Sequence, residues 1–342
     1  MPNDRLADLS PANFAIVMAT GILGLAAGQQ GHATLALVML AINAVAWPAI
    51  AALTIARALL HRHALAADLR SHQRSPGFFT AVAGTAVLAS QLIVLRIGGR
   101  LGLALAGLAG VLWLTLTYGI LVTLFIQQDK PALEDGISGG WLLTVVSTQS
   151  IAVLAALVAP HTAQPARLAL NFGALVFWLC GGMLYVWVIS LIFYRYAFLR
   201  FAPKDLTPTS WINMGAMAIS VLAGALLLLN APEAPFLHGL LSFVTGGTLL
   251  FWAVATWWIP MLAALAVWRY VRKRYPVRYE AAYWGAVFPL GMYSAATHQM
   301  SLALGLRFIA PLARGFFYIA LAAWVLAAFG LVQRLCSGSA SR

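Results

Sequence analysis

Charged residues and cysteines are scarce in this chain. Only 9% of its 342 residues are charged, whereas 62% are hydrophobic, and a soluble domain usually carries roughly 25% charged residues. The two cysteines, Cys180 and Cys336, are too few and too far apart in the sequence for a disulfide framework or a thiolate metal site. This composition excludes an ordinary soluble domain and indicates a protein embedded in a membrane.

Acidic residues are absent from the interior of every apolar run. All nine Asp and Glu residues lie in connecting segments or at the edges of runs. A cation pathway or a carboxylate proton relay normally places acids at depth in the membrane. If the chain moves a solute, the missing acids favour an anion or a neutral molecule.

Long apolar runs recur from one end of the chain to the other. Each is about as long as the ~20 residues that a helix needs to cross a bilayer core of about 30 Å. The predicted spans are 11–28, 33–56, 77–95, 101–126, 140–159, 167–193, 211–229, 237–268, 281–303 and 311–332. We therefore predict an all-α integral membrane protein with ten helices, in which residues 1–342 form a single transmembrane domain.

The distribution of basic residues predicts the orientation. Sixteen of the 21 Lys and Arg residues lie at the chain ends or in the connections after even-numbered spans, and five lie in the other connections. The positive-inside rule then places both termini in the cytoplasm and the protein in the plasma or inner membrane. The net charge of +12 is explained by this signal and by contact with anionic lipid. We expect no nucleic-acid partner, and we interpret the basic stretch "HRHALAADLRSHQR" as a solvated connection.

An internal repeat organises the ten spans. The aromatic residues Phe14, Phe79, Trp141, Trp211 and Trp284 open the five odd-numbered spans, and 65, 62, 70 and 73 residues separate them. The odd spans are rich in small and polar residues, which favour close helix packing and interior positions. The even spans are longer and richer in Leu and Val. This pattern predicts five hairpins in a ring, with odd helices around an axial passage and even helices facing lipid; ordinary small-residue packing without a passage is the alternative.

Several segments carry a resemblance to a known family. They are "PANFAIVMATGI", "GGWLLTVVSTQSIAVLAAL", "PTSWINMGAMAISVLAGALL", "FWAVATWWIP" and "WGAVFPLGMYSAAT". The chain resembles the tellurite-resistance and dicarboxylate transporter family, which includes plant slow-type anion channels, fungal malate carriers and fungal sulfite exporters. The resemblance implies ten helices, a pore formed by the five odd helices, a homotrimer, and a phenylalanine on the ninth helix that plugs the pore. Phe288 occupies the matching position.

The residues around Phe288 suggest how a plug could be placed. Pro289 removes the backbone hydrogen bond to the Gly285 carbonyl, and Gly285 and Gly291 weaken the helix on either side. We expect a kink that brings the Phe288 ring onto the axis, where it could close a narrow passage sterically and by dewetting. The alternative is that Phe288 packs beside a routine membrane kink.

Small and polar residues of the odd spans are candidates to line the passage. Hydroxyls, amides and helix termini can solvate an anion without holding it too tightly. The predicted liners are Ala15, Ala19, Thr20, Gly84, Thr85, Ser147, Thr148, Gln149, Asn213, Gly215, Ser294 and Thr297. Ser and Thr also bond to their own helix backbone, which is the alternative for each hydroxyl. Where other members of the family often have glycine, this chain has Ala15 or Ala19, so the width of the passage does not follow from the resemblance.

These features favour transport of an inorganic anion, an oxyanion or a C4-dicarboxylate, with no catalysis, cofactor or metal. His298 is the one histidine expected well inside a span, and it could relay protons in a proton-coupled, malate-type carrier. An intramembrane enzyme is less well supported, because facing histidine pairs for haem and a His-Glu-x-x-His zinc motif are both missing.

Overall fold

The computed structural model describes residues 6–276 and 279–337, and ten long helices dominate this part of the chain. The odd-numbered predicted spans are α1 (Ala15–Gln29), α4 (Phe79–Val94), α7 (Leu143–Val158), α9 (Ile212–Asn230) and α11 (Trp284–Ala303). The even-numbered spans are α2 (Ala33–Leu60), α5 (Gly99–Ile126), α8 (Ala166–Phe198), α10 (Leu241–Val267) and α12 (Ala310–Ser337). The predicted all-α membrane fold is confirmed. The sequence analysis predicts that both chain ends lie in the cytoplasm, and these ends, residues 1–5 and 338–342, fall outside the described residues.

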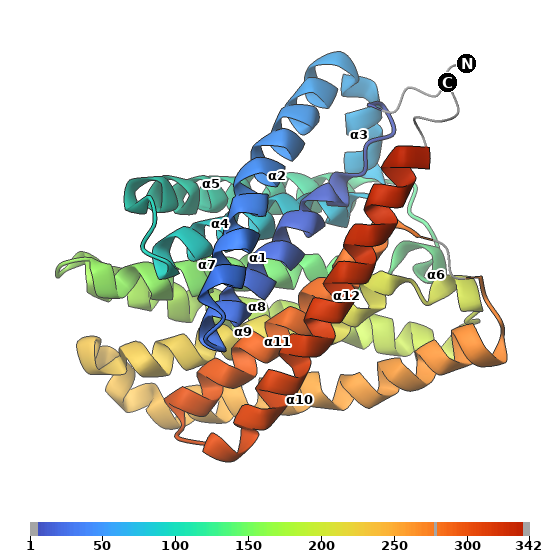
Figure 1. Cartoon of the computed structure of the whole chain (residues 1–342). Helices are drawn as coiled ribbons and strands as arrows, with labels where there is room; N and C mark the ends of the chain where they lie inside the picture. Colours follow the sequence, from blue (N-terminus) through green and yellow to red (C-terminus); the bar gives the residue numbers. More distant parts are fainter. Residues whose placement is uncertain (1–5, 277–278, 338–342) are drawn as a thin grey trace.

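The odd helices form a closed inner ring. α1 packs on α4, α4 on α7, α7 on α9, α9 on α11, and α11 on α1 again. Between 67% and 89% of the spanning window is buried in α1, α4, α7 and α9, against 17–33% in the even helices. α11 has 13 buried residues out of 20. Figure 1 shows α1 and α11 in the interior, with α2 and α12 beside them.

Length and apolar composition mark nine described helical segments as able to cross a membrane. α11 is not among the nine, and it carries His298, Gln299 and several hydroxyls. Its neighbours α9, α12 and α1 enclose it as the fifth member of the ring. The even helices present large apolar side chains outward, including Val45, Phe125 and Leu326, which are 67–72% exposed. Such an apolar surface fits a lipid environment.

Each inner helix is entered through a short 3-10 turn. The five turns are Pro11–Phe14, Ser75–Phe78, Gly139–Leu142, Pro208–Trp211 and Ala281–Tyr283. Proline opens three of them, where its missing N–H needs no helical partner. From the first turn to the fifth, each turn contacts the next, so they form a collar at the N-terminal end of the inner ring. The collar confirms that the repeat seen in the sequence is structural.

Five tryptophan side chains tie the outer helices to the inner ring. Each outer helix donates one indole N–H to the inner helix of the next hairpin, and α12 closes the circle onto α1. The pairs are Trp47 with Thr85 Oγ1, Trp113 with Thr148 Oγ1, Trp178 with the Ser220 carbonyl, Trp252 with Thr297 Oγ1 and Trp324 with Thr20 Oγ1, at 2.9–3.0 Å. Trp178 is buried and the other four are partly buried, and an indole N–H removed from water needs such an acceptor.

Three outer helices end in a buried arginine that binds the start of its own hairpin. Arg57 donates to the Ala7 carbonyl, Arg195 to the Ile137 carbonyl and Arg269 to the Leu206 carbonyl. All three side chains lie in residues that are at most 7% exposed. These three basic residues therefore stabilise the fold, in addition to any part they have in the positive-inside signal.

The connection between α2 and α4 is a correction to the sequence analysis. It was expected to be solvated, but it contains the helix α3 (Arg62–Arg70) and a buried carboxylate. Asp68 is 6% exposed and lies between Arg57, at 2.8 Å, and Arg74, whose Nη2 lies at 3.0 Å. The sequence shows the acid and the two bases but not that they meet, because the contact depends on how α3 folds back on α2.

Candidate functional site

Two cavities lie along the axis of the inner ring. The N-side cavity, near the collar, has a volume of about 30 Å³, and the C-side cavity, near the other end of the inner helices, has about 210 Å³. Each is lined by residues of all five inner helices or of the turns that open them. The N-side cavity is lined by Ala12, Ala15, Met18, Thr80, Leu143, Thr209, Ile212, Ala281, Ala282, Gly285 and Phe288. Both cavities therefore belong to the ring as a whole.

Phe288 lies at the N-side cavity as an almost fully buried ring. Its exposure is 1%, and Gly285, one turn earlier on α11, lines the same cavity. α11 continues as a helix through Pro289, which packs against α9. A Cβ on Gly215 would lie 2.7 Å from Pro289 Cγ, so glycine at this position allows α9 to approach the proline. Gly291 faces α1 in the same way, because its Cβ would lie 3.0 Å from Ile22 Cγ2.

Apolar side chains fill the ring between the two cavities. Helical periodicity connects the lining residues of each helix into one stripe, for example Ala15, Met18 and Ile22 on α1. On the other four inner helices the same spacing places one residue between the N-side and C-side lining residues. These residues are Ala83 on α4, Val146 on α7, Ile219 on α9 and Met292 on α11, and each is at most 1% exposed. The section between the cavities is therefore closed and apolar.

Only Ala15 among the twelve predicted liners lines an axial cavity. Ala19, Thr20, Gly84, Thr85, Ser147, Thr148, Gln149, Asn213, Gly215, Ser294 and Thr297 line neither the N-side nor the C-side cavity. Most of the polar members have partners elsewhere. The hydroxyls of Thr20, Thr85, Thr148 and Thr297 accept the tryptophan bonds from the outer helices. Their side chains thus point between the two rings of helices.

Three more polar candidates donate to backbone carbonyls. Ser147 donates to the Thr144 carbonyl of its own helix, and Ser294 donates to the Ala313 carbonyl of α12. Gln149 donates to the Trp178 carbonyl of α8. Asn213 is fully buried on the second residue of α9, and its carbonyl accepts from a tyrosine of α8. Gly84 allows close contact with Phe14, since its Cβ would lie 3.2 Å from the Phe14 carbonyl oxygen.

Other polar residues line the axial cavities and were not predicted. Thr80 and Thr209 border the N-side cavity, while Ser90, Gln29 and Gln299 border the C-side cavity. The Gln29 and Gln299 amides approach each other at 3.5 Å across the end of the ring. A sequence signal existed for Thr80 and Thr209, because each lies in or directly after an opening turn. Nothing in the sequence distinguishes the two glutamines from polar residues at a membrane surface.

His298 is partly buried near the C-terminal end of α11 and lines neither axial cavity. Ala295 and Gln299 of the same helix do line the C-side cavity, so the histidine is directed to another side of α11. Within the described residues its ring makes no ion pair with a carboxylate. This placement does not favour a proton relay along the axis.

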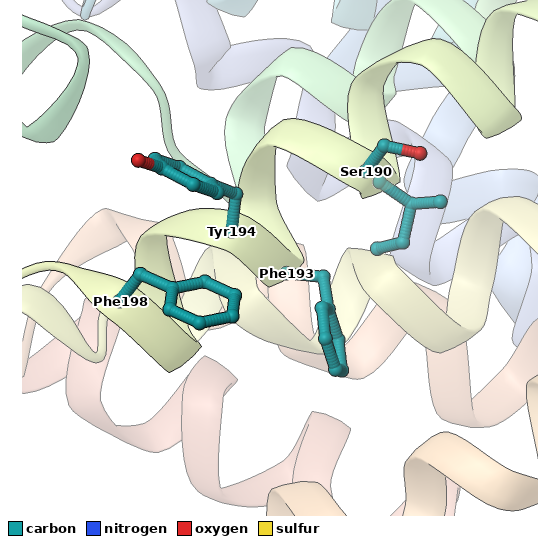
Figure 2. A pocket seen from close by; sticks show the side chains of 5 residues that line it. Ser190, Phe193, Tyr194 and Phe198 are labelled. Carbon is teal, nitrogen blue, oxygen red and sulfur yellow. The ribbon is translucent and has the colours of Figure 1, made fainter.

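A hollow of about 380 Å³ lies on the outer surface of α8 (Figure 2). Its lining side chains all come from this one helix, and three of them, Phe193, Tyr194 and Phe198, are 48–71% exposed. It is a groove between side chains on the lipid-facing surface. We assign it no role, because no second element contributes to it.

The comparison with known proteins decides the family. Residues 8–332 match the family described as voltage-dependent anion channel. The chain belongs to that family. An uncharacterized membrane protein of Mycobacterium tuberculosis is 40% identical over 156 residues, which cover 45% of this chain and 78% of the relative. An uncharacterized transporter of Methanocaldococcus jannaschii is 23% identical over 228 residues, covering 65% of this chain and 63% of the relative.

The family match confirms the resemblance found in the sequence. It extends over nearly all of the helical ring, from before the first opening turn into α12. Together with the apolar outer helices, it establishes a multi-pass membrane protein of an anion-transporting family. The family contains channels and transporters, which is consistent with a protein that is not an enzyme.

Proposed function

We propose that this protein conducts small anions along the axis of the inner ring and that Phe288 closes the pathway. The two axial cavities are the wide parts of this pathway, and the apolar section between them is its narrow part. With the predicted orientation, the N-side cavity faces the cytoplasm. In this proposal the pathway is closed between the cavities, which is supported by the burial of Met18 and Met292, each 1% exposed.

The observation that carries the proposal is the position of Phe288 at the N-side cavity. The ring is 1% exposed, yet it borders a cavity to which all five repeats contribute. Its neighbours along the axis, such as Met18 and Met292, are apolar. A narrow apolar section excludes water, and an ion cannot cross it with its hydration shell. Moving one aromatic ring aside would widen this section.

The polar groups along the pathway favour an anion over a cation. No Asp or Glu lines either axial cavity, so a cation finds no carboxylate there. Hydroxyls and amides, such as those of Thr209 and Gln29, can donate hydrogen bonds to an anion. The carbonyl that Pro289 leaves without its helical donor is an acceptor and does not help an anion. Family membership supports the same conclusion.

Reversal potentials of the reconstituted Phe288→Ala variant test this proposal. In liposomes or planar bilayers with asymmetric potassium chloride, we expect the reversal potential to lie close to that of chloride. Replacing chloride by nitrate and then by malate on one side would show whether the pathway accepts a dicarboxylate. A reversal potential close to that of potassium would contradict the anion pathway.

A further inference from the structure

A separate cavity lies on the side of α11 that faces away from the axis. It has a volume of about 220 Å³ and lies between α10, the opening turn of α9 and the first turns of α11. Ala286 and Leu290 line it, whereas Gly285 and Phe288 line the axial N-side cavity. At 100° per residue these two pairs occupy nearly opposite faces of the helix. The cavity is several times larger than the about 30 Å³ that one water molecule occupies.

Arg269 brings a positive charge into this cavity. It belongs to the π-helical turn Trp268–Arg272 at the end of α10, lines the cavity and is only 4% exposed. Its Nη1 donates to the Leu206 carbonyl, and its guanidinium lies 4.3 Å from the Tyr275 ring centre and 5.0 Å from that of Tyr270. Its Nε is buried without a hydrogen-bond partner.

The three buried arginines at the ends of outer helices provide an internal comparison. Arg57 lies 2.8 Å from the Asp68 carboxylate, and Arg195 lies 3.6 Å from that of Asp205. Arg269 forms no ion pair with a carboxylate of the described residues. The Nε of Arg195 is unpaired as well, so this atom does not distinguish Arg269. Arg269 is distinguished by its missing carboxylate partner and by the adjoining cavity.

A buried charge without a counter-charge is expensive, and aromatic rings compensate it only in part. An anionic group in the cavity would give Arg269 the counter-charge that Asp68 gives to Arg57 and Asp205 gives to Arg195. The hydroxyls of Tyr270 and Tyr283, which lie 3.3 Å apart, and of Ser210 border the same space and can donate further hydrogen bonds. The nearby carboxylate of Glu280 is on the exposed surface.

We propose that this cavity is a binding site for a phosphate-type anionic group, separate from the axial pathway. Ala266, Tyr270 and Tyr283, which line the cavity at the end of α10 and the start of α11, are partly exposed. A phospholipid headgroup can therefore reach the cavity from the membrane, and free phosphate can reach it from water. Either group would contact α11 on the side opposite Phe288.

Lipid binding to three purified proteins tests the proposal: the wild type, Arg269→Gln and the control Arg272→Gln. Arg272 is an exposed neighbour in the same π-helical turn, so its substitution makes the same change in net charge without changing the cavity. Native mass spectrometry would count bound phosphatidylglycerol against phosphatidylcholine. Because a hydrogen bond to a charged group contributes about 1.5–3 kcal/mol, we expect Arg269→Gln to weaken phosphatidylglycerol binding about tenfold or more. The control should bind like the wild type.

A parallel titration with inorganic phosphate, followed by the melting temperature in a neutral detergent, separates the two sources. Stabilisation by phosphate that depends on Arg269 would identify a free anion as the ligand, and stabilisation by phosphatidylglycerol alone would identify a lipid. If Arg269→Gln does not fold, Ala266→Leu fills the cavity without removing the charge and should weaken binding equally. Equal binding of either ligand by wild type and cavity variants would overturn the proposal. None of these readouts depends on anion flux.

Discussion

Replacing Phe288 by alanine should open the axial pathway. The ring borders the N-side cavity, so its removal joins the space of the side chain to that cavity and shortens the apolar section. We expect the chloride flux through reconstituted protein to rise at least about tenfold, which corresponds to lowering the barrier by about 1.4 kcal/mol. Phe317→Ala is the matched control, because Phe317 is equally buried at 1% but lies on the outer helix α12.

The two variants should also differ in stability. Phe288→Ala, the variant with the higher expected flux, should be destabilised less than Phe317→Ala. Truncating a buried phenylalanine in a packed core costs about 3–5 kcal/mol. We expect a cost in this range for Phe317, whose ring stacks on His32 with centres 5.4 Å apart. Phe288 borders a cavity on one side and so loses fewer contacts, and its truncation should cost less. The 1% exposure of Phe288 limits this difference in cost.

The assay combines chloride efflux from liposomes with the melting temperature of the same preparations. The reasoning predicts high flux and modest destabilisation for Phe288→Ala, and unchanged flux with strong destabilisation for Phe317→Ala. Equal flux in wild type and Phe288→Ala, accompanied by a large fall in melting temperature, would show that Phe288 is a packing residue. A leak of similar size in both variants would indicate general loosening of the ring.

Other substitutions test the scaffold and the pathway. Trp324→Phe removes one of the five tryptophan bonds and should cost about 1 kcal/mol, measured by thermal or denaturant unfolding in detergent. Asp68→Asn leaves the buried Arg57 and the exposed Arg74 without their carboxylate, so a loss of about 3–5 kcal/mol is expected in the same measurement. Gly215→Ala forces a Cβ against the proline of α11 and should cost about 1–3 kcal/mol, whereas Gly246→Ala, with open space around it, should be neutral or stabilising. Ala295→Asp, in the C-side cavity, should reduce anion flux in the Phe288→Ala background, while the uncharged Ala295→Asn should not; equal flux in both would argue against an axial route.

The arrangement of the helices could be predicted from the sequence because it depends on patterns that repeat. The span predicted at 211–229 is helical over Ile212–Asn230, and the one predicted from 33 begins at Ala33. Length and apolar character define a span, and small residues distinguish inner from outer helices. Helix α3 was missed because it is short and mixes apolar with charged residues, and because the burial of Asp68 depends on a contact between three charged side chains.

The site could be predicted only in part. Ala15, Gly285 and Phe288 do line the N-side cavity, whereas the hydroxyls of Thr20 and Thr148 face the outer helices. An inner helix has two interior directions, toward the axis and toward its outer partners, and composition does not distinguish them. A signal was present in the tryptophans near the middle of the outer helices, because a buried indole requires an acceptor on the adjacent helix.

The tryptophan bonds have a consequence for how fast the pathway could open. Every inner helix is bonded to an outer helix of the neighbouring hairpin, so tilting one inner helix would break one of the five tryptophan hydrogen bonds. Turning the Phe288 side chain breaks none of them. Side-chain rotations are orders of magnitude faster than collective helix movements, which take microseconds to milliseconds. Opening through the proposed gate should therefore consist of brief, frequent events, and single-channel recordings of long, stable openings in the wild type would argue for a movement of α11 itself.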